Sequence, residues 1–373
     1  MKFILACAGT AGHINPALSI AEAIKELWPD AELLFIGAGR PMENRLIPEA
    51  GYKIENIRIE GFSRSMSLDG IKKNLRNVKN LILSPREAGK IIDSFRPDCC
   101  IGTGGYVCYP VMKAAHKRGI PTALHESNAV PGLANKLLDG TVDRIMVAFK
   151  GTEGKYKHPE RIAFTGTPIR GEFETVTREE ARAALGIPAG AKVVTSFWGS
   201  LGAAGMNAKM VDFIKKNAGE RAFYHSHATG GGKEGFEGFK EKLYNAGLFN
   251  YSDFLDLRPY IDDMGRVFAA SDLVICRAGA STLAELTAVG RASILVPSEI
   301  ANIRQDENAL MVERAGGAKM LREKETDGAK LYAEAVALLS DGERIAQMEK
   351  GAASIGAPDS KKLIQKVILD ILK

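Results

Sequence analysis

The chain has 373 residues, a formal net charge of +5 at pH 7, 39 glycines and five cysteines. The length is too great for one ordinary hydrophobic core and predicts two α/β domains. The charge is mild and indicates no nucleic-acid partner. No apolar run reaches the roughly 18 residues of a membrane-spanning helix.

The cysteines and histidines exclude the common metal sites. No CxxC pair is present, and no residues join His225 and His227 to complete a ligand set. We therefore expect reduced thiols in the cytoplasm and no metal. The apolar run 2–8 has the length of a strand and ends at a glycine turn, so it is interpreted as a strand and not as a signal peptide.

Strand-like apolar runs alternate with helical patterns in the first half of the chain. This alternation predicts right-handed βαβ units and a parallel sheet. The pattern pauses near 166–170, and we place a first Rossmann-like domain at 1–166. The strand-like runs are 2–8, 32–38, 99–105, 122–126 and 144–149, and the helical segments are 16–27, 42–50, 109–117 and 133–138.

The first strand is followed by the glycine turn 8–13, after which Asn15 and Pro16 are typical of an N-cap and a first helical residue. The glycines do not have the GxGxxG spacing, and no acidic residue ends the second strand, so a dehydrogenase is disfavoured. His13 stands at the carboxyl end of the first strand. A lone histidine is more often structural, but an imidazole at this place can act as a general base at neutral pH.

The segment 68–83 has apolar residues at helical spacing, four Lys or Arg residues and a single acid, Asp69. This pattern is typical of a helix that lies on an anionic lipid surface. An amphipathic core helix with a solvated basic face is the alternative. The scarcity of acids favours the lipid surface.

Two further glycine turns follow strands, at 102–106 and at 198–202. Such turns expose N–H groups that bind oxyanions, and three of them favour a diphosphate ligand. No DxD motif is present, so we expect helix N-termini and arginine to stabilise a leaving phosphate, with no cofactor required.

A second alternation predicts a second Rossmann-like domain at 167–354, with a last helix at 355–373 that packs back on the first domain. A cleft between two such domains is the expected place for a small ligand. The segment 229–233 lacks the Ser or Thr of a Walker motif and is interpreted as a flexible turn. Asp262 and Asp263 fit a helix cap better than a cation site. The strand-like runs are 192–198, 222–228, 252–257, 272–276 and 292–297.

The stretch 276–285 joins a buried strand to a helix start, where an anionic ligand is expected. Thr282 and Glu285 have the spacing of a capping box, which is the simpler interpretation of the stretch alone. The alternative is that Glu285 binds the hydroxyls of a ribose and that Arg277 faces a charged or sugar group.

Taken together, the ordered motifs resemble the MurG family of GT-B glycosyltransferases over nearly the whole chain. The resemblance implies two Rossmann-like domains and inverting transfer of N-acetylglucosamine from UDP-GlcNAc to the 4-hydroxyl of the N-acetylmuramyl unit of lipid I, giving lipid II. It also implies a peripheral enzyme at the cytoplasmic face of the cell membrane, with an anionic membrane surface and other cell-wall enzymes as partners. The motifs are AGTAGHINPAL, GTGGYVCYP, HESNAVPGLANKLL, GTPIR, WGSLGA, YIDDM, RAGASTLAE and IRQDENA.

The resemblance also implies residue roles. His13 is the catalytic base. Donor contacts are implied for Thr10, Gly12, Asn128, Arg170, Ser200, Ile261, Met264, Arg277, Ala280, Thr282, Glu285 and Gln305. Acceptor or diphosphate contacts are implied for Gly9, Gly104, Gly105, Tyr106, His125 and Glu126.

A UDP-GlcNAc 2-epimerase, which shares the fold and the donor, is one alternative. Several positions depart from the family pattern, and they motivate a second alternative, a catalytically degenerate GT-B scaffold protein. Where the family has glycine at two positions of the first turn, this chain has alanine, so the backbone there must avoid positive φ or bear strain. The departures are Ala8, Ala11, Ser127, Thr167, Trp198, Leu201 and Arg304.

Overall fold

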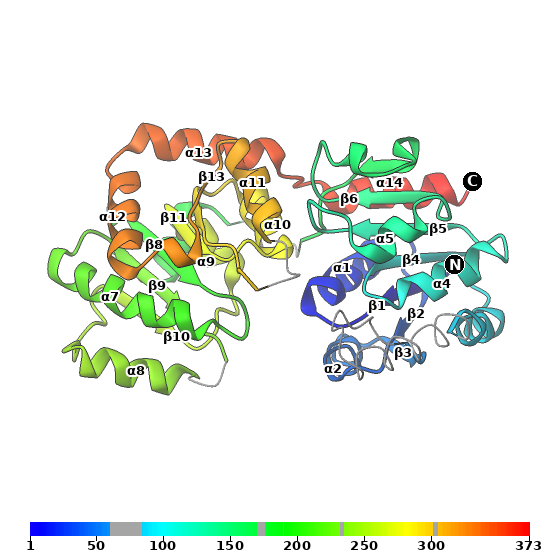
Figure 1. Ribbon diagram of the computed structural model, residues 1–373, viewed down its shortest axis with the longest axis horizontal. Coiled ribbons are helices and arrows are strands. Elements are labelled where there is room, and N and C mark those ends of the chain that lie inside the picture. The colour runs from blue at the N-terminus through cyan, green and yellow to red at the C-terminus, as the bar shows by residue number, and fades with distance from the viewer. Residues whose placement is uncertain (60–83, 170–175, 189, 232–234, 301–304) are drawn as a thin grey trace. The chain divides into compact units, whose positions relative to one another are not determined.

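The structure is a computed structural model that describes residues 1–59, 84–169, 176–188, 190–231, 235–300 and 305–373. The chain divides into two compact units (Figure 1). Unit 1 comprises Met1–Ile169 and Asp359–Lys373, and unit 2 comprises Arg170–Pro358. The sequence placed the boundary at 166/167. The segment 68–83, Arg170 and Arg304 lie outside the described residues.

Unit 1 is a parallel sheet with helices on both faces, which confirms the predicted fold class. Its strands are β1 Lys2–Cys7, β2 Glu32–Gly37, β3 Lys53–Asn56, β4 Cys99–Gly104, β5 Thr122–Glu126, β6 Arg144–Val147 and β7 Ile162–Phe164. They lie in the order β3-β2-β1-β4-β5-β6-β7. The helices are α1 Ala11–Leu27, α2 Pro41–Glu49, a helix over 84–95, α4 Cys108–His116, α5 Leu133–Leu138 and α14 Ser360–Ile371, with single 3-10 turns at η1 Glu153–Lys155 and η2 Pro159–Arg161.

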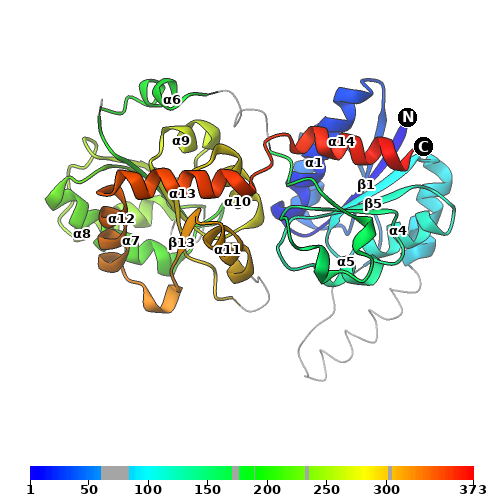
Figure 2. The same cartoon turned by 90° about the horizontal axis from the view of Figure 1, so that it is seen from above.

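Strand β1 shows why the strands of unit 1 are apolar on both faces. Ile4 and Ala6 belong to the core beneath α4 and the helix over 84–95, whereas Phe3 and Leu5 belong to the core beneath α1 and α14. Helices on both faces leave no solvated side to the sheet, so the strands read as continuous apolar runs. Helix α14 packs against α1 (Figure 2).

Unit 2 repeats this plan with a six-stranded parallel sheet in the order β10-β9-β8-β11-β12-β13. The strands are β8 Val193–Phe197, β9 Tyr224–Ala228, β10 Leu255–Arg258, β11 Leu273–Cys276, β12 Ser293–Leu295 and β13 Ala318–Met320. The helices are α6 Arg178–Ala184, α7 Ala204–Glu220, α8 Gly235–Asn245, α9 Met264–Ala270, α10 Ala280–Val289, α11 Gln305–Arg314, η4 Glu323–Glu325, α12 Gly328–Leu339 and α13 Gly342–Ile355.

The sequence analysis missed the short strands β3, β7 and β13. Each has only three or four residues. The residues of β3 are largely exposed, and those of β7 are half-buried. Strands this short give no apolar run to detect. They form because a neighbouring strand offers its free edge.

Within the described residues, no helix is both long enough and apolar enough to span a membrane.

Candidate functional site

In unit 1 the loops after β1, β2 and β4 meet at one edge of the sheet, because parallel strands end on the same side. A cavity of about 700 Å³ opens there. Its walls come from the first glycine turn, the second glycine turn and the loop before α2. The lining residues are Ala8, Gly9, Thr10, His13, Ala38, Arg40, Pro41, Met42, Ile59, Gly105 and Tyr106.

His13 lies in the first turn of α1, which corrects the predicted helix start at Pro16. The helix begins at Ala11 with Thr10 as N-cap, and Pro16 is inside it. The amides of His13 and Ile14 both donate to the Thr10 carbonyl, at 3.0 and 3.1 Å. A proline at this depth removes only one internal hydrogen bond of the helix. The buried face of α1 against the sheet outweighs that loss.

The second glycine turn fixes the position of His13. The Thr103 hydroxyl, buried at the end of β4, donates to the His13 carbonyl at 2.7 Å. A Cβ on Gly104 would lie 2.2 Å from His13 Nδ1, and Gly104 has φ +126°. Only glycine leaves room for the imidazole here. Thr103 was not identified from the sequence, and its only signal is its place beside the glycines of the turn.

Burial favours the neutral form of the His13 imidazole. Burial lowers its pKa below the ordinary value of 6.5, and the nearby Glu126 carboxylate opposes part of this shift. A neutral imidazole at the rim of a cavity can accept a proton from a bound hydroxyl. The geometry therefore suits a general base.

His125 and Glu126, for which acceptor contacts were implied, are instead buried structural groups. His125 is 0 % exposed, and its Nε2 lies 2.9 Å from the Gly166 carbonyl, so this nitrogen carries the proton. The Ser127 hydroxyl approaches Nδ1 at 3.3 Å. Both ring nitrogens thus have partners within unit 1, and burial lowers the pKa of His125.

Glu126 is 4 % exposed and holds the loop after β5. Its Oε1 accepts from the amide and the side chain of Asn128, at 3.0 and 3.1 Å. Its Oε2 accepts from the Gly132 amide and the Asn135 side chain, both at 2.7 Å. The carboxylate holds Asn128 in place, and four hydrogen bonds from Asn128, Gly132 and Asn135 occupy its oxygens.

The first glycine turn packs against the second, and its own Gly9 amide has a partner within unit 1. The Gly9 amide, expected to face a phosphate, donates instead to the Glu43 carboxylate at 2.7 Å. Gly105 has φ +84°, and a Cβ there would lie 2.7 Å from the Ala8 carbonyl. Tyr106 is 43 % exposed at the cavity. Ala8 and Ala11 avoid positive φ, because Gly9 alone takes the turn at +97°.

In unit 2 the loops after β8, β10, β11 and β12 likewise share one edge of the sheet. The third glycine turn places Ser200 there, exposed, with its carbonyl accepting from the Gly231 amide at 3.0 Å. A Cβ on Gly202 would lie 2.1 Å from the Thr229 carbonyl. Residues 229–231 therefore pack against the third turn, and the rest of the predicted flexible turn lies outside the described residues.

The capping box predicted for Thr282 and Glu285 is wrong. Helix α10 begins at Ala280, its N-cap is Gly279, and no side chain caps it. Thr282 is thus already in the first turn of α10. The amides of the first three residues of α10 have no partner within the helix. A helix start of this kind attracts anions. Half-buried Glu285 lies one turn further along the same helix.

Arg277 belongs to the framework beneath the third turn. Its Nη1 donates to the carbonyls of Val296 and Pro297, both at 3.1 Å, and pairs with Glu323 at 2.7 Å. The guanidinium carbon lies 5.9 Å from the centre of the buried Trp198 ring. Trp198 has become part of the hydrophobic core of unit 2, whereas Leu201 is exposed.

Three further predicted donor residues lie at the same edge of unit 2. Ile261 is buried, and Met264 begins α9. Asp263 is the N-cap residue by position, but its side chain accepts from Arg258 at 2.8 Å and caps no amide. Gln305 begins α11 and accepts from the Ser298 amide at 2.9 Å. Thr10, Gly12 and Asn128, with implied donor contacts, lie on unit 1.

His225 and His227 are buried on β9 and share the Ser196 hydroxyl, at 2.8 and 2.7 Å. No group of three or more histidine, cysteine or acidic side chains able to hold a metal ion occurs within the described residues.

Two units of this kind, each with its loops gathered at the carboxyl edge of a parallel sheet, define the GT-B fold. Residues 3–147 match the glycosyltransferase family 28 N-terminal domain, and residues 193–364 match the glycosyltransferase family 28 C-terminal domain. The chain is therefore an enzyme of the glycosyltransferase class.

Relatives identify the particular family. The chain is 43 % identical over 374 residues to the UDP-N-acetylglucosamine–N-acetylmuramyl-(pentapeptide) pyrophosphoryl-undecaprenol N-acetylglucosamine transferase of Acetivibrio thermocellus, covering 100 % of this chain and 99 % of the relative. The chain belongs to the MurG family.

Solved structures share its fold. The crystal structure of Acinetobacter baumannii MurG has a TM-score of 0.76 at 24 % identity, covering 99 % of this chain and 98 % of the other. UDP-GlcNAc 2-epimerase from Neisseria meningitidis, bound to UDP-GlcNAc, has a TM-score of 0.65 at 13 % identity, covering 99 % and 100 %.

Proposed function

We propose that the protein transfers N-acetylglucosamine from UDP-GlcNAc to the 4-hydroxyl of the N-acetylmuramyl unit of lipid I, with inversion, giving lipid II. The observation that carries the proposal is the position of His13 at the rim of the unit 1 cavity, where burial favours its neutral form. The name of the Acetivibrio thermocellus relative supports the choice of donor and acceptor.

In this proposal, unit 1 receives the acceptor. A nitrogen of His13 removes the proton of the 4-hydroxyl as its oxygen forms a bond to C1 of the donor sugar. Gly104, Gly105 and Tyr106 would border the acceptor diphosphate. The side chains of His125 and Glu126 would shape the neighbouring loop without contacting the acceptor, since both are buried.

Unit 2 receives the donor. The bond from C1 to the UDP oxygen breaks, and UDP leaves with the electron pair. The amides at the start of α10 and the exposed Ser200 would stabilise its negative charge. Ile261 and Met264 would border the uracil, and Gln305 would bind sugar hydroxyls. Because helix N-termini supply this stabilisation, the proposal requires no metal or other cofactor.

The direct test is transfer of radiolabelled N-acetylglucosamine to a short-chain lipid I analogue, with UDP-GalNAc as the control donor. We expect a labelled disaccharide product from UDP-GlcNAc alone, and the same rate in the presence of EDTA. Release of free UDP and N-acetylmannosamine from UDP-GlcNAc without acceptor would instead indicate the 2-epimerase. No heat of UDP-GlcNAc binding at millimolar concentration would indicate the scaffold protein.

Replacing Glu285 with glutamine is expected to weaken UDP binding about 10- to 100-fold, because a carboxylate accepts from two ribose hydroxyls and an amide offers one oxygen. Calorimetry with UDP measures the change. Glu241→Gln, at an exposed position of α8, is the matched control and should bind as the wild type does. Equal affinity of Glu285→Gln and wild type would remove Glu285 from the ribose site.

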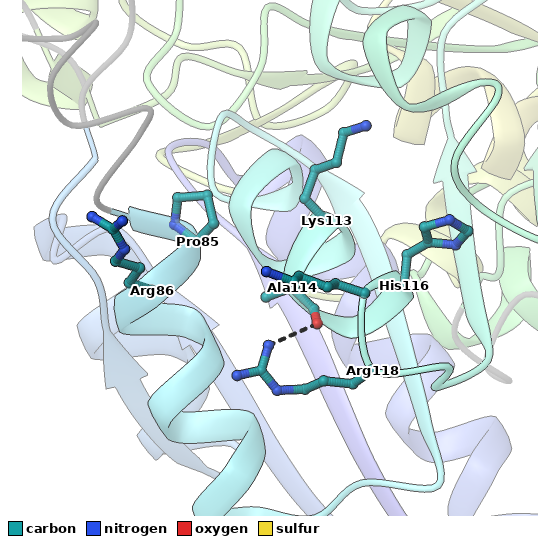
Figure 3. Close-up of a pocket in the computed structure, with 7 residues that line it drawn as sticks. Pro85, Arg86, Lys113, Ala114, His116 and Arg118 are labelled. Carbon is teal, nitrogen blue, oxygen red and sulfur yellow. Dashed lines mark hydrogen bonds between the residues drawn. The ribbon is translucent and has the colours of Figure 1, made fainter.

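We also propose that unit 1 rests peripherally on an anionic membrane at its cytoplasmic face, where other cell-wall enzymes could join it. The proposal is supported by a pocket of about 640 Å³ among basic residues of unit 1. It is lined by Pro85, Arg86, Lys113, Ala114, His116, Lys117 and Arg118 (Figure 3). Arg118 is paired with Asp93 at 2.6 Å and donates to the Ala114 carbonyl. Arg86, His116 and Lys117 are exposed.

Sedimentation with phospholipid vesicles tests the membrane proposal. We expect binding to anionic but not zwitterionic vesicles. The pair Arg86→Ser and Lys117→Ser should weaken it about 10-fold or more, at roughly 1 kcal/mol per cation. The pair Lys215→Ser and Lys216→Ser, exposed on α7 of unit 2, is the control. Equal binding by both double variants would contradict the proposed surface.

A further inference from the structure

Glu43 is a fully buried carboxylate at the start of α2, with 0 % exposure. Pro41 occupies the first position of the helix and Arg40 its N-cap, which places Glu43 at the third position. Its Oε1 accepts from the Arg40 amide at 3.1 Å, as an acid at this position commonly does. The same oxygen accepts from the Ala38 amide at 2.6 Å.

The second oxygen of Glu43 reaches a different part of the chain. Oε2 accepts from the Gly9 amide at 2.7 Å, across a separation of 34 residues. No lysine, arginine or histidine among the described residues forms an ion pair with this carboxylate. Its charge is therefore stabilised by three backbone N–H groups, and such charge-assisted hydrogen bonds are the strong ones.

The three amides belong to two walls of the unit 1 cavity. Gly9 lies in the first glycine turn, four residues before His13, and Ala38 and Arg40 lie in the loop after β2. Thr10, the N-cap of α1, makes no side-chain hydrogen bond to its helix. The turn that leads into α1 is thus held by Glu43 and not by a cap of its own.

We propose that Glu43 is a positioning residue: its carboxylate fixes the first glycine turn against the loop after β2 and thereby sets the place of His13 at the cavity. This inference rests on the proposed role of His13 as the base. A purely structural carboxylate would stabilise unit 1 without affecting the rate per folded molecule. A positioning residue changes that rate, because small displacements of a catalytic group are costly.

The test is steady-state transfer to the short-chain lipid I analogue by Glu43→Gln, at a temperature where circular dichroism shows the variant folded. The glutamine side chain offers only one acceptor oxygen, so its NH2 group must face one of the backbone N–H groups that now donate to the Glu43 carboxylate. We expect kcat to fall about 10- to 100-fold, the range of one lost hydrogen bond to a charged group. KM for UDP-GlcNAc should change less than threefold. A kcat within twofold of the wild-type value would overturn the proposal.

Two further variants sharpen the result. Glu43→Asp keeps the carboxylate and can still accept from the Arg40 amide at the start of α2. Its side chain is one methylene too short to reach the Gly9 amide, so we expect a similar loss of kcat. If Glu43→Gln does not fold, this variant decides, and full activity in it would overturn the proposal. Asn56→Ala is the matched control, because Asn56 accepts from the Gly39 amide of the same loop at 3.0 Å and does not contact Gly9.

Asn56→Ala should keep the wild-type kcat. An equal loss in Asn56→Ala and Glu43→Gln would assign the effect to general loosening of the loop after β2 and would overturn the role of the Gly9 contact. The wild-type and His13→Ala arms separate this inference from the proposed function. Absence of transfer by the wild type would contradict the function, whereas transfer that depends on His13 but not on Glu43 would contradict only the positioning role.

Discussion

Replacing His13 with alanine is expected to lower kcat for transfer by about 10²- to 10⁴-fold, the usual contribution of a general base. The Thr103 hydroxyl bonds to the His13 carbonyl, and Gly104 leaves room for the imidazole. Among the described residues, no other histidine lines the cavity. UDP affinity, measured by calorimetry, should stay within twofold, because the proposed nucleotide contacts lie on unit 2. His158→Ala is the control and should keep full activity, because this half-buried histidine lies 3.2 Å from Glu160 and does not line the cavity.

The pH dependence of kcat/KM provides a second measure of the same group. The reaction needs neutral His13, so the rate should rise with pH through the His13 pKa and then become constant. Because burial lowers this pKa from 6.5, the midpoint of the acid limb should lie below pH 6.5. A midpoint above 6.5, or unchanged turnover in His13→Ala, would remove His13 as the base.

The sheets and most helices could be predicted from the sequence, because the apolar runs and helical patterns that indicate them are local. Apolar runs such as Cys99–Gly104 and Thr122–Glu126 lie within the strands of unit 1 as predicted. The residue at which a helix begins was harder to predict. Asn15 and Pro16 form a convincing start signal, yet α1 begins at Ala11, since Pro16 costs the helix only one hydrogen bond and the first turn packs against residues 90 positions away.

The site residues show a different limit. Motif positions identified His13 and the glycines of the second turn, but not which polar groups are buried. Glu126 shares its motif with Asn128, and only the fold shows that the carboxylate is occupied by its own loop. Glu43 had a usable signal, an acid two residues after a proline at a helix start. Its bond to Gly9, 34 residues away, could not be read from local sequence.

Replacing Gly104 with alanine is expected to reduce kcat about 100-fold or more. A Cβ at this position would lie 2.2 Å from His13 Nδ1, and φ of +126° disfavours any side chain. The imidazole must move, and a displacement of about 1 Å at a catalytic group can cost that factor. Gly51→Ala is the control for backbone strain, because Gly51 also has positive φ, +84°, but nothing lies within 4 Å of its added Cβ.

A double-mutant cycle separates the collision from the strain. Thermal or denaturant unfolding gives the stability lost on Gly104→Ala in the wild type and in His13→Ala. With the imidazole removed, only the cost of the backbone conformation remains, about 1–3 kcal/mol, so the loss should be smaller in the His13→Ala background. Two contacting residues commonly couple by 0.5–3 kcal/mol. Equal losses in both backgrounds would mean that the second glycine turn does not set the position of His13, and the proposed base would then lack its main structural support.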